Sequence, residues 1–187
     1  MYVKTKKIPD KILCLITDTK IKDREKTLKI IEEAVSNGTN IVQLREKHLP
    51  ALDFLNFGRD IQSITRNKAL FIINDRIDIA MILKCDGVHL GEKSIPINYA
   101  KDLLGNKFIL GKSIHSVNET LSELESFLDY WIIGPIFKTL SHPNSDPIGL
   151  GAITELKKVS PLPIIGIGGI TQNNSNYIIE RGAIGVA

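Results

Sequence analysis

Short apolar runs alternate along this chain with longer segments in which apolar residues recur at helical spacing. A strand buried on both faces of a parallel sheet gives a continuous apolar run, whereas a surface helix gives one apolar stripe. The apolar runs predict strands at residues 12–16, 41–45, 70–73, 87–91, 108–111, 130–134, 163–167 and 183–187. The segments between them predict helices at residues 24–37, 51–65, 77–83, 96–104, 117–128, 152–159 and 174–181.

This alternation predicts an α/β fold, a (β/α)8 TIM barrel formed by residues 1–187 as a single domain. The chain is shorter than the roughly 250 residues typical of such barrels. A doubly wound open sheet shows the same alternation and is the alternative architecture. The last predicted strand reaches Ala187, where the sequence stops, so the final helix is missing from this chain. Without that helix an apolar stripe of the barrel would be uncovered. We therefore expect that the natural chain continues or that a partner covers this stripe.

Composition and charge narrow the class of protein. With 43% hydrophobic and 24% charged residues, the chain resembles an ordinary globular protein. The net charge of +3 is small and the basic residues are scattered, which argues against nucleic acid as a partner. No apolar run approaches the ~20 residues that span a bilayer, and no signal peptide is recognisable. Cys14 and Cys85 lack metal-ligand or redox spacing, which predicts two reduced thiols in a cytoplasmic protein.

Polar residues occur where the predicted strands end. Gln43 and Arg45 have the same parity on one strand, and Lys47 continues that series beyond its end. Asp75 follows another strand. Parallel strands place their carboxyl ends, where barrels carry their chemistry, at one mouth. Cations and one carboxylate at that mouth suit a phosphorylated, metal-bound anion.

Histidine and glycine extend this candidate site. Gly111, Ser113 and His115 share parity at the end of a third strand, and His115 is a candidate proton-transfer group. His89 lies inside an apolar run and is expected to be a hydrogen-bonded core residue rather than a ligand. The glycine-rich residues 166–170 end the seventh strand, in the region where barrels commonly hold phosphate. Residues 135–150 form a long polar loop of the kind that is usually functional or disordered.

Several motifs together resemble the thiamine-phosphate synthase family, in the order in which they occur there. They are Gln43-Leu44-Arg45-Glu46-Lys47, Ile73-Asn74-Asp75-Arg76 with Asp78-Ile79-Ala80, Asp86-Gly87-Val88-His89-Leu90-Gly91, Gly134-Pro135-Ile136-Phe137 with Thr139, and Ile167-Gly168-Gly169-Ile170. The resemblance covers nearly the whole chain. It implies a (β/α)8 transferase that joins a hydroxymethylpyrimidine diphosphate to a thiazole phosphate and releases pyrophosphate, with diphosphate leaving before the thiazole nitrogen attacks.

The resemblance also implies roles for individual residues. Substrate binding would fall to Gln43, Arg45, Lys47, Asn74, Ser113, Thr139, Ser141, His142 and Gly169. Catalytic roles would fall to Arg45, Lys47, Ser113, His115 and His142. Asp75, with Ser94, would occupy the Mg²⁺ site. The implied partners are the two phosphorylated substrates, with a homo-oligomer possible.

Three departures from the family pattern bear on activity, one of which is that the family segment that closes the last strand and contacts the thiazole phosphate would lie just beyond Ala187. Ser94 stands where the family has a second Mg²⁺-binding aspartate, and His142 stands where it has a lysine. Ser141 replaces a threonine and keeps the hydroxyl. One carboxylate can still hold Mg²⁺ together with waters and substrate phosphates. Glu92 lies near enough in sequence to be considered as a substitute, although its parity differs.

Two other functions remain open on the sequence. Gly111-Lys112-Ser113-Ile114-His115-Ser116 also resembles the thiazole tautomerase-like proteins of the same superfamily, in which His115 would transfer the proton. Lys47 and Asn74-Asp75 argue against that alternative, because a tautomerase has no evident need for them. A non-catalytic protein that binds a phosphorylated ligand is the third hypothesis.

Overall fold

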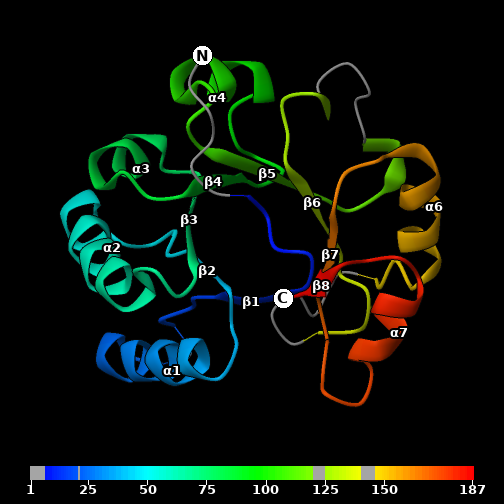
Figure 1. The fold of residues 1–187 in the computed structure, drawn as a ribbon, viewed down its shortest axis with the longest axis horizontal. Helices are drawn as coiled ribbons and strands as arrows, with labels where there is room; N and C mark the ends of the chain where they lie inside the picture. The colour runs from blue at the N-terminus through cyan, green and yellow to red at the C-terminus, as the bar shows by residue number, and fades with distance from the viewer. Residues whose placement is uncertain (1–6, 21, 120–124, 140–145) are drawn as a thin grey trace.

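A closed barrel of eight parallel strands forms the centre of the molecule, with helices around it (Figure 1). This computed structural model describes residues 7–20, 22–119, 125–139 and 146–187. The strands are β1 Ile12–Ile16, β2 Ile41–Leu44, β3 Leu70–Asn74, β4 Gly87–Leu90, β5 Ile109–Ile114, β6 Tyr130–Ile133, β7 Ile164–Gly166 and β8 Gly185–Val186. The helices are α1 Arg24–Ser36, α2 Ala51–Thr65, α3 Ile77–Leu83, α4 Ile97–Leu104, α6 Gly151–Val159 and α7 Ser175–Glu180, and η1 Val117–Glu119 is a 3₁₀ helix.

The predicted barrel is confirmed, because the sheet closes on itself. Each strand pairs with its neighbour in chain order, and β1 also pairs with β8, where Ile12 lies opposite Gly185. An open doubly wound sheet would leave two unpaired edges, so that alternative is wrong. The sequence ends at Ala187, directly after β8.

Local signals in the sequence explain where helices begin. The side chain of Asp23 caps α1 by accepting a hydrogen bond from the Lys26 backbone N–H (2.9 Å), and Ile31 and Val35 bury the inner face of the helix. One proline immediately precedes α2 and another immediately precedes α4. The fixed φ of proline suits the start of a helix.

The structure differs most from the sequence prediction in three segments, and the other elements differ by at most one residue at each end. β5 is longer than predicted and reaches Ile114, because the polar Lys112 and Ser113 continue its pairing with β6. β8 is shorter, at Gly185–Val186. The helix predicted at residues 117–128 begins as the 3₁₀ helix η1, next to a turn in which Ser116 Oγ accepts from the Asn118 N–H. Residues 120–124 of that segment lie outside the described part of the chain.

Two apolar clusters stabilise the fold, one on each side of the sheet. The cluster inside the barrel is small and includes Ile41, Ile72, Tyr130 and Ile132. The larger cluster fills the space between the strands and the surrounding helices. Because successive side chains of a strand point to opposite faces, strands such as β2, β3, β5 and β6 contribute to both clusters. The strands therefore read as continuous apolar runs.

Gly111 and Tyr130 fill one space inside the barrel together. They lie opposite each other on β5 and β6, and a Cβ built on Gly111 would come within 2.1 Å of Tyr130 Cζ. Tyr130 is 1% exposed, so its ring cannot move into solvent. The glycine is therefore required by its large neighbour.

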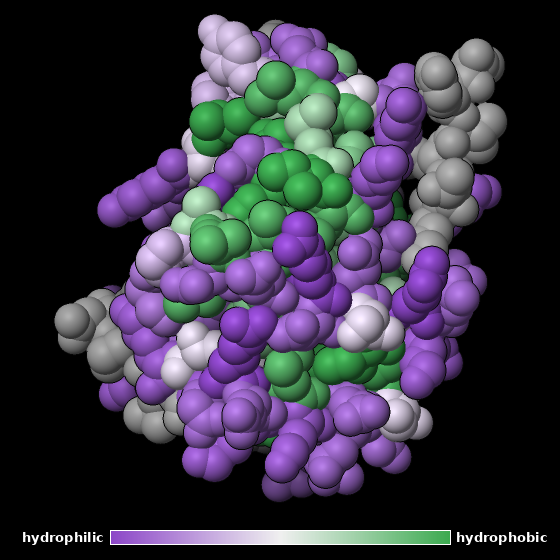
Figure 2. Space-filling view, turned by 90° about the vertical axis from the view of Figure 1, so that its left-hand side faces the viewer, coloured by the Kyte–Doolittle hydropathy of each residue, from purple (hydrophilic) through white to green (hydrophobic). Residues whose placement is uncertain are grey.

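An apolar surface covers part of α3 and α4. Figure 2 shows apolar side chains gathered on this face, where Met81, Ile82 and Leu103 are exposed. In the described ranges, no helix combines the length and apolar character needed to cross a membrane.

We predict that Gly111→Ala lowers the free energy of unfolding by about 1–3 kcal/mol, because the new methyl group overpacks the barrel interior. Gly151→Ala is the matched control, since a Cβ there meets nothing within 4 Å. Urea denaturation of both variants measures the effect. Equal stability of the two variants would contradict the packing described for Gly111 and Tyr130.

Candidate active site

A cavity of about 630 Å³ opens at the carboxyl ends of the strands. We call it the barrel-mouth cavity. Among its lining residues are Thr17, Asp18, Gln43, Arg45, Lys47, Asn74, His89, Gly91, Glu92, Lys93, Ser113, His115, Gly134, Pro135, Thr139, Gly168 and Gly169. It therefore receives polar side chains from most strands of the barrel.

The polar row at the end of β2 faces this cavity, as parity predicted. Gln43, Arg45 and Lys47 all line it, and we call Arg45 and Lys47, which follow the strand, the β2 cations. Gln43 is 1% exposed, and its Nε2 has no hydrogen-bond partner among the described residues. A buried amide donor without a partner costs free energy, so this side chain is arranged for a ligand atom that accepts a hydrogen bond.

A hydrogen-bonded chain runs beneath the cavity from Tyr130 through His89 to Ser113. His89 Nδ1 lies 3.2 Å from the Tyr130 hydroxyl, and its Nε2 lies 2.7 Å from Ser113 Oγ. The expectation that His89 is a hydrogen-bonded core residue is confirmed, although its ring also forms part of the cavity floor. Burial lowers the His89 pKa to about 3, so the imidazole is neutral at pH 7.

A neutral His89 imidazole has a single N–H, so it donates one of these hydrogen bonds and accepts the other. Burial raises the pKa of Tyr130 well above its usual value, so the phenol keeps its proton. We assign that proton to the hydrogen bond with His89 Nδ1, the acceptor next to it. A neutral imidazole then has its own N–H at Nε2, which donates to Ser113 Oγ. The Ser113 hydroxyl proton remains available to a ligand in the cavity.

Asp75 lies beside the cavity, but its side chain is not among the lining residues. Asn74 takes the inward position at the end of β3, and Asp75 follows it with φ +61°. Its Oδ2 accepts from Asn74 Nδ2 (2.7 Å), and its Oδ1 accepts from the Ser94 hydroxyl. Gly91, which follows β4, donates its backbone N–H to Ser94 Oγ (2.6 Å). Asp75 and Ser94, the two positions that the family resemblance assigns to the metal site, thus meet at the cavity edge.

Lys112 adds a cation to this edge that sequence reasoning missed. Its Nζ donates to the Gly91 carbonyl oxygen (3.3 Å). Partial burial lowers its pKa, and the negative charges of Glu119, Asp75 and Glu92 oppose that shift. Ser113, the next residue on β5, faces the cavity. Lys112 has the opposite parity, so parity alone would have placed its side chain away from the site.

The carboxylate of Asp75 can still accept a metal ion. Each of its oxygens has two lone pairs, and the described contacts do not use all of them. The described residues contain no group of three or more histidine, cysteine or carboxylate side chains around one point. Mg²⁺ commonly takes only one or two carboxylates and completes its shell with water and phosphate oxygens, so the residues present fit this ion.

His115 lies at the cavity wall with one nitrogen fixed. Its Nδ1 lies 2.7 Å from the Gly134 carbonyl oxygen, so Nδ1 carries a proton. Its Nε2 lies 4.0 Å from Glu92 Oε2. Glu92 thus lies near His115 and also lines the cavity, and its use as a substitute metal ligand stays a prediction.

Backbone from the ends of β6 and β7 forms the opposite wall. Gly168 and Gly169 have φ +100° and +65°, and a Cβ at Gly169 would come within 2.4 Å of the Lys138 carbonyl oxygen. Only glycine combines this conformation with so close an approach. Thr139 lines the cavity on the same side. These residues leave backbone amides accessible to an anion.

The predicted site residues are therefore mostly brought together. Those that line the barrel-mouth cavity are Gln43, Arg45, Lys47, Asn74, Ser113, His115, Thr139 and Gly169, and those at its edge are Asp75 and Ser94. Ser141 and His142 lie outside the described residues. The structure adds Thr17, Asp18 and Lys93, none of which was predicted. Thr17 and Asp18 directly follow the first apolar run, so the rule applied to the other strand ends would have found them.

A parallel barrel with cations, hydroxyls and glycine backbone around one mouth defines a phosphate-binding barrel enzyme. Comparison with known proteins names its family. The family model described as thiamine monophosphate synthase matches residues 13–187. The chain belongs to this family, as its motifs predicted. The prediction of a thiamine-phosphate synthase, a transferase of thiamine biosynthesis, is thereby confirmed.

Individual relatives agree with this assignment. Over 176 residues the chain is 38% identical to a thiamine-phosphate synthase of Clostridium acetobutylicum, covering 94% of this chain and 83% of that protein. It is 37% identical to that of Moorella thermoacetica, covering 96% and 87%. A solved structure, thiamine phosphate pyrophosphorylase from Pyrococcus furiosus, superposes with a TM-score of 0.84 at 30% identity, covering 95% of this chain and 85% of that one.

We predict that lowering the pH reduces the free energy of unfolding, because His89 is buried in its neutral form. Its pKa is about 3 in the folded protein and near 6.5 when unfolded, so between these values only the unfolded chain binds the proton. Stability is therefore lost as the pH falls below about 6.5. By pH 5 the loss from this group should reach about 2 kcal/mol.

Urea denaturation of the wild type and of His89→Gln at pH 7.5 and pH 5 measures this loss. The variant shares every other titrating group, so the difference between the two pH dependences belongs to His89. Parallel losses of stability would show that His89 is not held neutral.

Proposed function

We propose that this protein joins a hydroxymethylpyrimidine diphosphate to a thiazole phosphate and releases pyrophosphate. The observation that carries the proposal is the row of Gln43, Arg45 and Lys47 on one wall of the barrel-mouth cavity. The glycine backbone at Gly168 and Gly169 also lines this cavity and would serve as a separate anion site. Two phosphorylated substrates need two such sites.

The diphosphate would lie against the β2 cations. Arg45 can contact two phosphate oxygens with its planar guanidinium, and Lys47 adds a point charge. Ser113 would donate its hydroxyl proton, because His89 donates to its oxygen from below. As the bond to the pyrimidine methylene breaks, negative charge grows on the leaving diphosphate. These donors stabilise that charge without rearranging, which lowers the barrier.

Mg²⁺ would be held by Asp75, with the Ser94 hydroxyl beside it and phosphate oxygens completing the shell. When bound, the ion supplies positive charge to the diphosphate. Asn74 orients the Asp75 carboxylate through its side-chain amide and faces the cavity itself. Ser94 has no charge of its own, so this site would depend more on the substrate than one with two carboxylates.

The thiazole phosphate would occupy the opposite wall. Its oxygens can accept from backbone N–H groups near Gly168 and Gly169 and from the Thr139 hydroxyl. Ser141 and His142, proposed for the same substrate from the sequence, belong to the part of the loop outside the described residues. The thiazole nitrogen would then face the pyrimidine carbon from which diphosphate departs.

A thiazole tautomerase remains a second candidate because of the geometry of His115. Its Nδ1–H is fixed on the Gly134 carbonyl oxygen, which leaves Nε2 as the basic nitrogen at the cavity wall. Such an imidazole can move a proton between two ligand atoms. The β2 cations favour the synthase, since an isomerisation gives them no leaving group to stabilise.

The finer expectations from the sequence stay part of this proposal. The two buried cysteines, whose pKa values burial raises to about 12, would be inert thiols in a cytoplasmic enzyme. A homo-oligomer and the absence of nucleic-acid or membrane partners remain expectations.

An assay of the full chain with both phosphorylated substrates and Mg²⁺ tests the proposal. We expect thiamine phosphate to form, and Arg45→Ala to lower kcat/KM by about 100-fold or more through loss of charged hydrogen bonds. Absence of thiamine phosphate would exclude the synthase. Isomerisation of a thiazole carboxylate phosphate that His115→Ala abolishes would establish the tautomerase instead. Ligand binding without either turnover would indicate the non-catalytic binder.

Gln43→Met tests the unpaired amide separately. The substitution keeps the volume but removes the donor, so we expect an about tenfold higher KM for the pyrimidine substrate and no loss of stability. Gln62→Met is the matched control: the Gln62 amide donates to the Leu83 carbonyl oxygen (2.8 Å), outside the barrel-mouth cavity. It should lower stability and leave KM unchanged. An unchanged KM for Gln43→Met would remove Gln43 from the binding site.

A further inference from the structure

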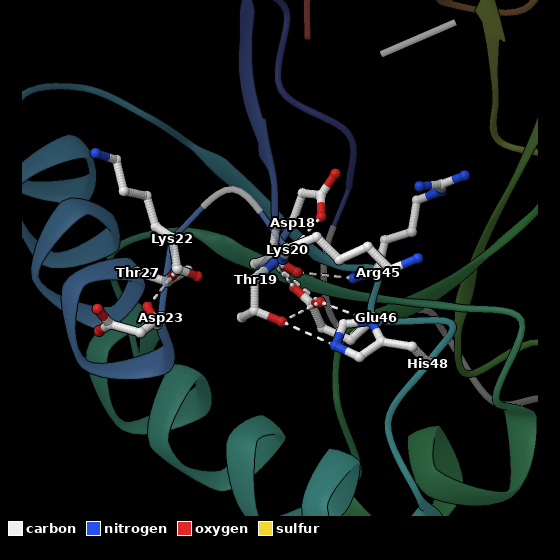
Figure 3. A network of polar contacts seen from close by, with 10 residues as sticks. Asp18, Thr19, Lys20, Lys22, Asp23, Thr27, Arg45, Glu46 and His48 are labelled. Atoms are coloured by element: carbon white, nitrogen blue, oxygen red, sulfur yellow. Dashed lines mark hydrogen bonds and ion pairs between the residues drawn. The ribbon is translucent and has the colours of Figure 1, made fainter.

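A buried carboxylate lies between the two β2 cations in sequence but points elsewhere. Glu46 is 2% exposed, and it does not line the cavity that Arg45 faces. Figure 3 shows its side chain converging with Thr19 and His48, whereas Arg45 and Asp18 extend away from that cluster. Alternation along the chain explains the arrangement, since neighbouring side chains take opposite directions.

Every hydrogen bond described for this carboxylate comes from Thr19, in the segment between β1 and α1. The Thr19 N–H lies 3.1 Å from Oε1 and 3.0 Å from Oε2, and the Thr19 hydroxyl donates to Oε2 at 2.6 Å. His48 is close to both partners, with Nε2 3.3 Å from Thr19 Oγ and Nδ1 3.7 Å from Glu46 Oε2. One residue of that segment is thus held at both its backbone and its side chain.

The segment held in this way forms part of the cavity wall. Thr17 and Asp18, immediately before Thr19, line the cavity. Thr17 Oγ accepts from the Arg45 backbone N–H (3.0 Å), so it joins the same two segments from the other side. The contacts of Thr17 and Thr19 fix the distance between Asp18 on one segment and the β2 cations on the other.

Closure of the barrel does not require this contact. β1 and β2 are already paired at three positions, which are Cys14 with Ile41, Leu15 with Val42, and Ile16 with Gln43. A buried carboxylate is also a poor way to gain stability, because its desolvation offsets much of what its hydrogen bonds contribute. The contribution of Glu46 is therefore better explained by the positions in which it holds the neighbouring residues than by stability.

We propose that Glu46 is a positioning residue for the diphosphate subsite, acting through Thr19. By holding the segment after β1 against the end of β2, it fixes the directions of Arg45 and Lys47 on one side and of Asp18 on the other. This inference rests on the proposed function, in which the β2 cations bind the diphosphate. Glu46 itself does not touch the ligand.

Variants of Thr19 test the inference in the full chain, because this residue is outside the binding machinery. Thr19→Val removes the hydroxyl and keeps the shape, whereas Thr19→Ser keeps the hydroxyl. We expect Thr19→Val to raise the KM for the pyrimidine diphosphate and the Kd of inorganic pyrophosphate with Mg²⁺ by about tenfold. Thr19→Ser should stay within about twofold of the wild type. Steady-state kinetics and titration calorimetry give these values.

Glu46→Gln provides a second variant if Thr19→Val does not fold. Its amide keeps one acceptor oxygen but turns a donor toward Thr19, so pyrophosphate binding should weaken in the same way. Thermal unfolding of each variant separates positioning from stability. A lower Tm with wild-type KM and Kd would overturn the inference, and so would equal losses in Thr19→Val and Thr19→Ser.

Arg45→Ala separates this inference from the function on which it rests. If Arg45→Ala loses pyrophosphate binding while Thr19→Val and Glu46→Gln retain it, only the positioning role of Glu46 is wrong. If the wild type binds no pyrophosphate and forms no thiamine phosphate, the proposed function fails, and the positioning role fails with it.

Discussion

The interior of a closed barrel accepts only one of every two side chains along each strand, and the rest of the site depends on this constraint. At the middle of the barrel the inward positions are filled by apolar and aromatic side chains such as Ile72 and Tyr130. Nearer the carboxyl ends the same parity brings in Gln43 and Ser113. The apolar interior and the polar mouth are therefore one series of positions. The side chains packed in the interior therefore orient the polar groups at the mouth. The hydrogen-bonded chain from Tyr130 through His89 to Ser113 is an example.

Most of the fold could be predicted from the sequence because strands buried on both faces and amphipathic helices leave different periods. The period does not describe how an element begins or ends. β5 continues through Lys112 and Ser113, whose polarity suggested that the strand had stopped. Apolar spacing predicted a helix after Ser116, but that segment begins as the 3₁₀ helix η1, next to a turn formed by the Ser116 hydroxyl. Backbone pairing and side-chain hydrogen bonds, rather than apolar spacing, determine these boundaries.

The parts of the candidate site that follow from strand parity and strand ends could be predicted from the sequence. The contacts that depend on the conformation of a loop could not. The row formed by Gln43 and the β2 cations follows from alternation alone. The contact between Asp75 and Ser94 depends on the loop after β4, where Gly91 orients the serine hydroxyl. No spacing rule gives such a contact, and the resemblance to a family was needed to pair the two residues. Lys112 was missed because it reaches the cavity edge from the outer face of β5.

The alternation of Arg45, Glu46 and Lys47 has a consequence for how this protein can change over time. Because side-chain direction reverses at every residue, a deletion or insertion of a single residue within β2 would exchange the two faces. Glu46 would then enter the cavity, and the cations would be buried beneath the segment after β1. An anion-binding mouth would become one that repels anions, with every residue type still present. The length of β2 is thus as much a determinant of ligand charge as the residues that follow it.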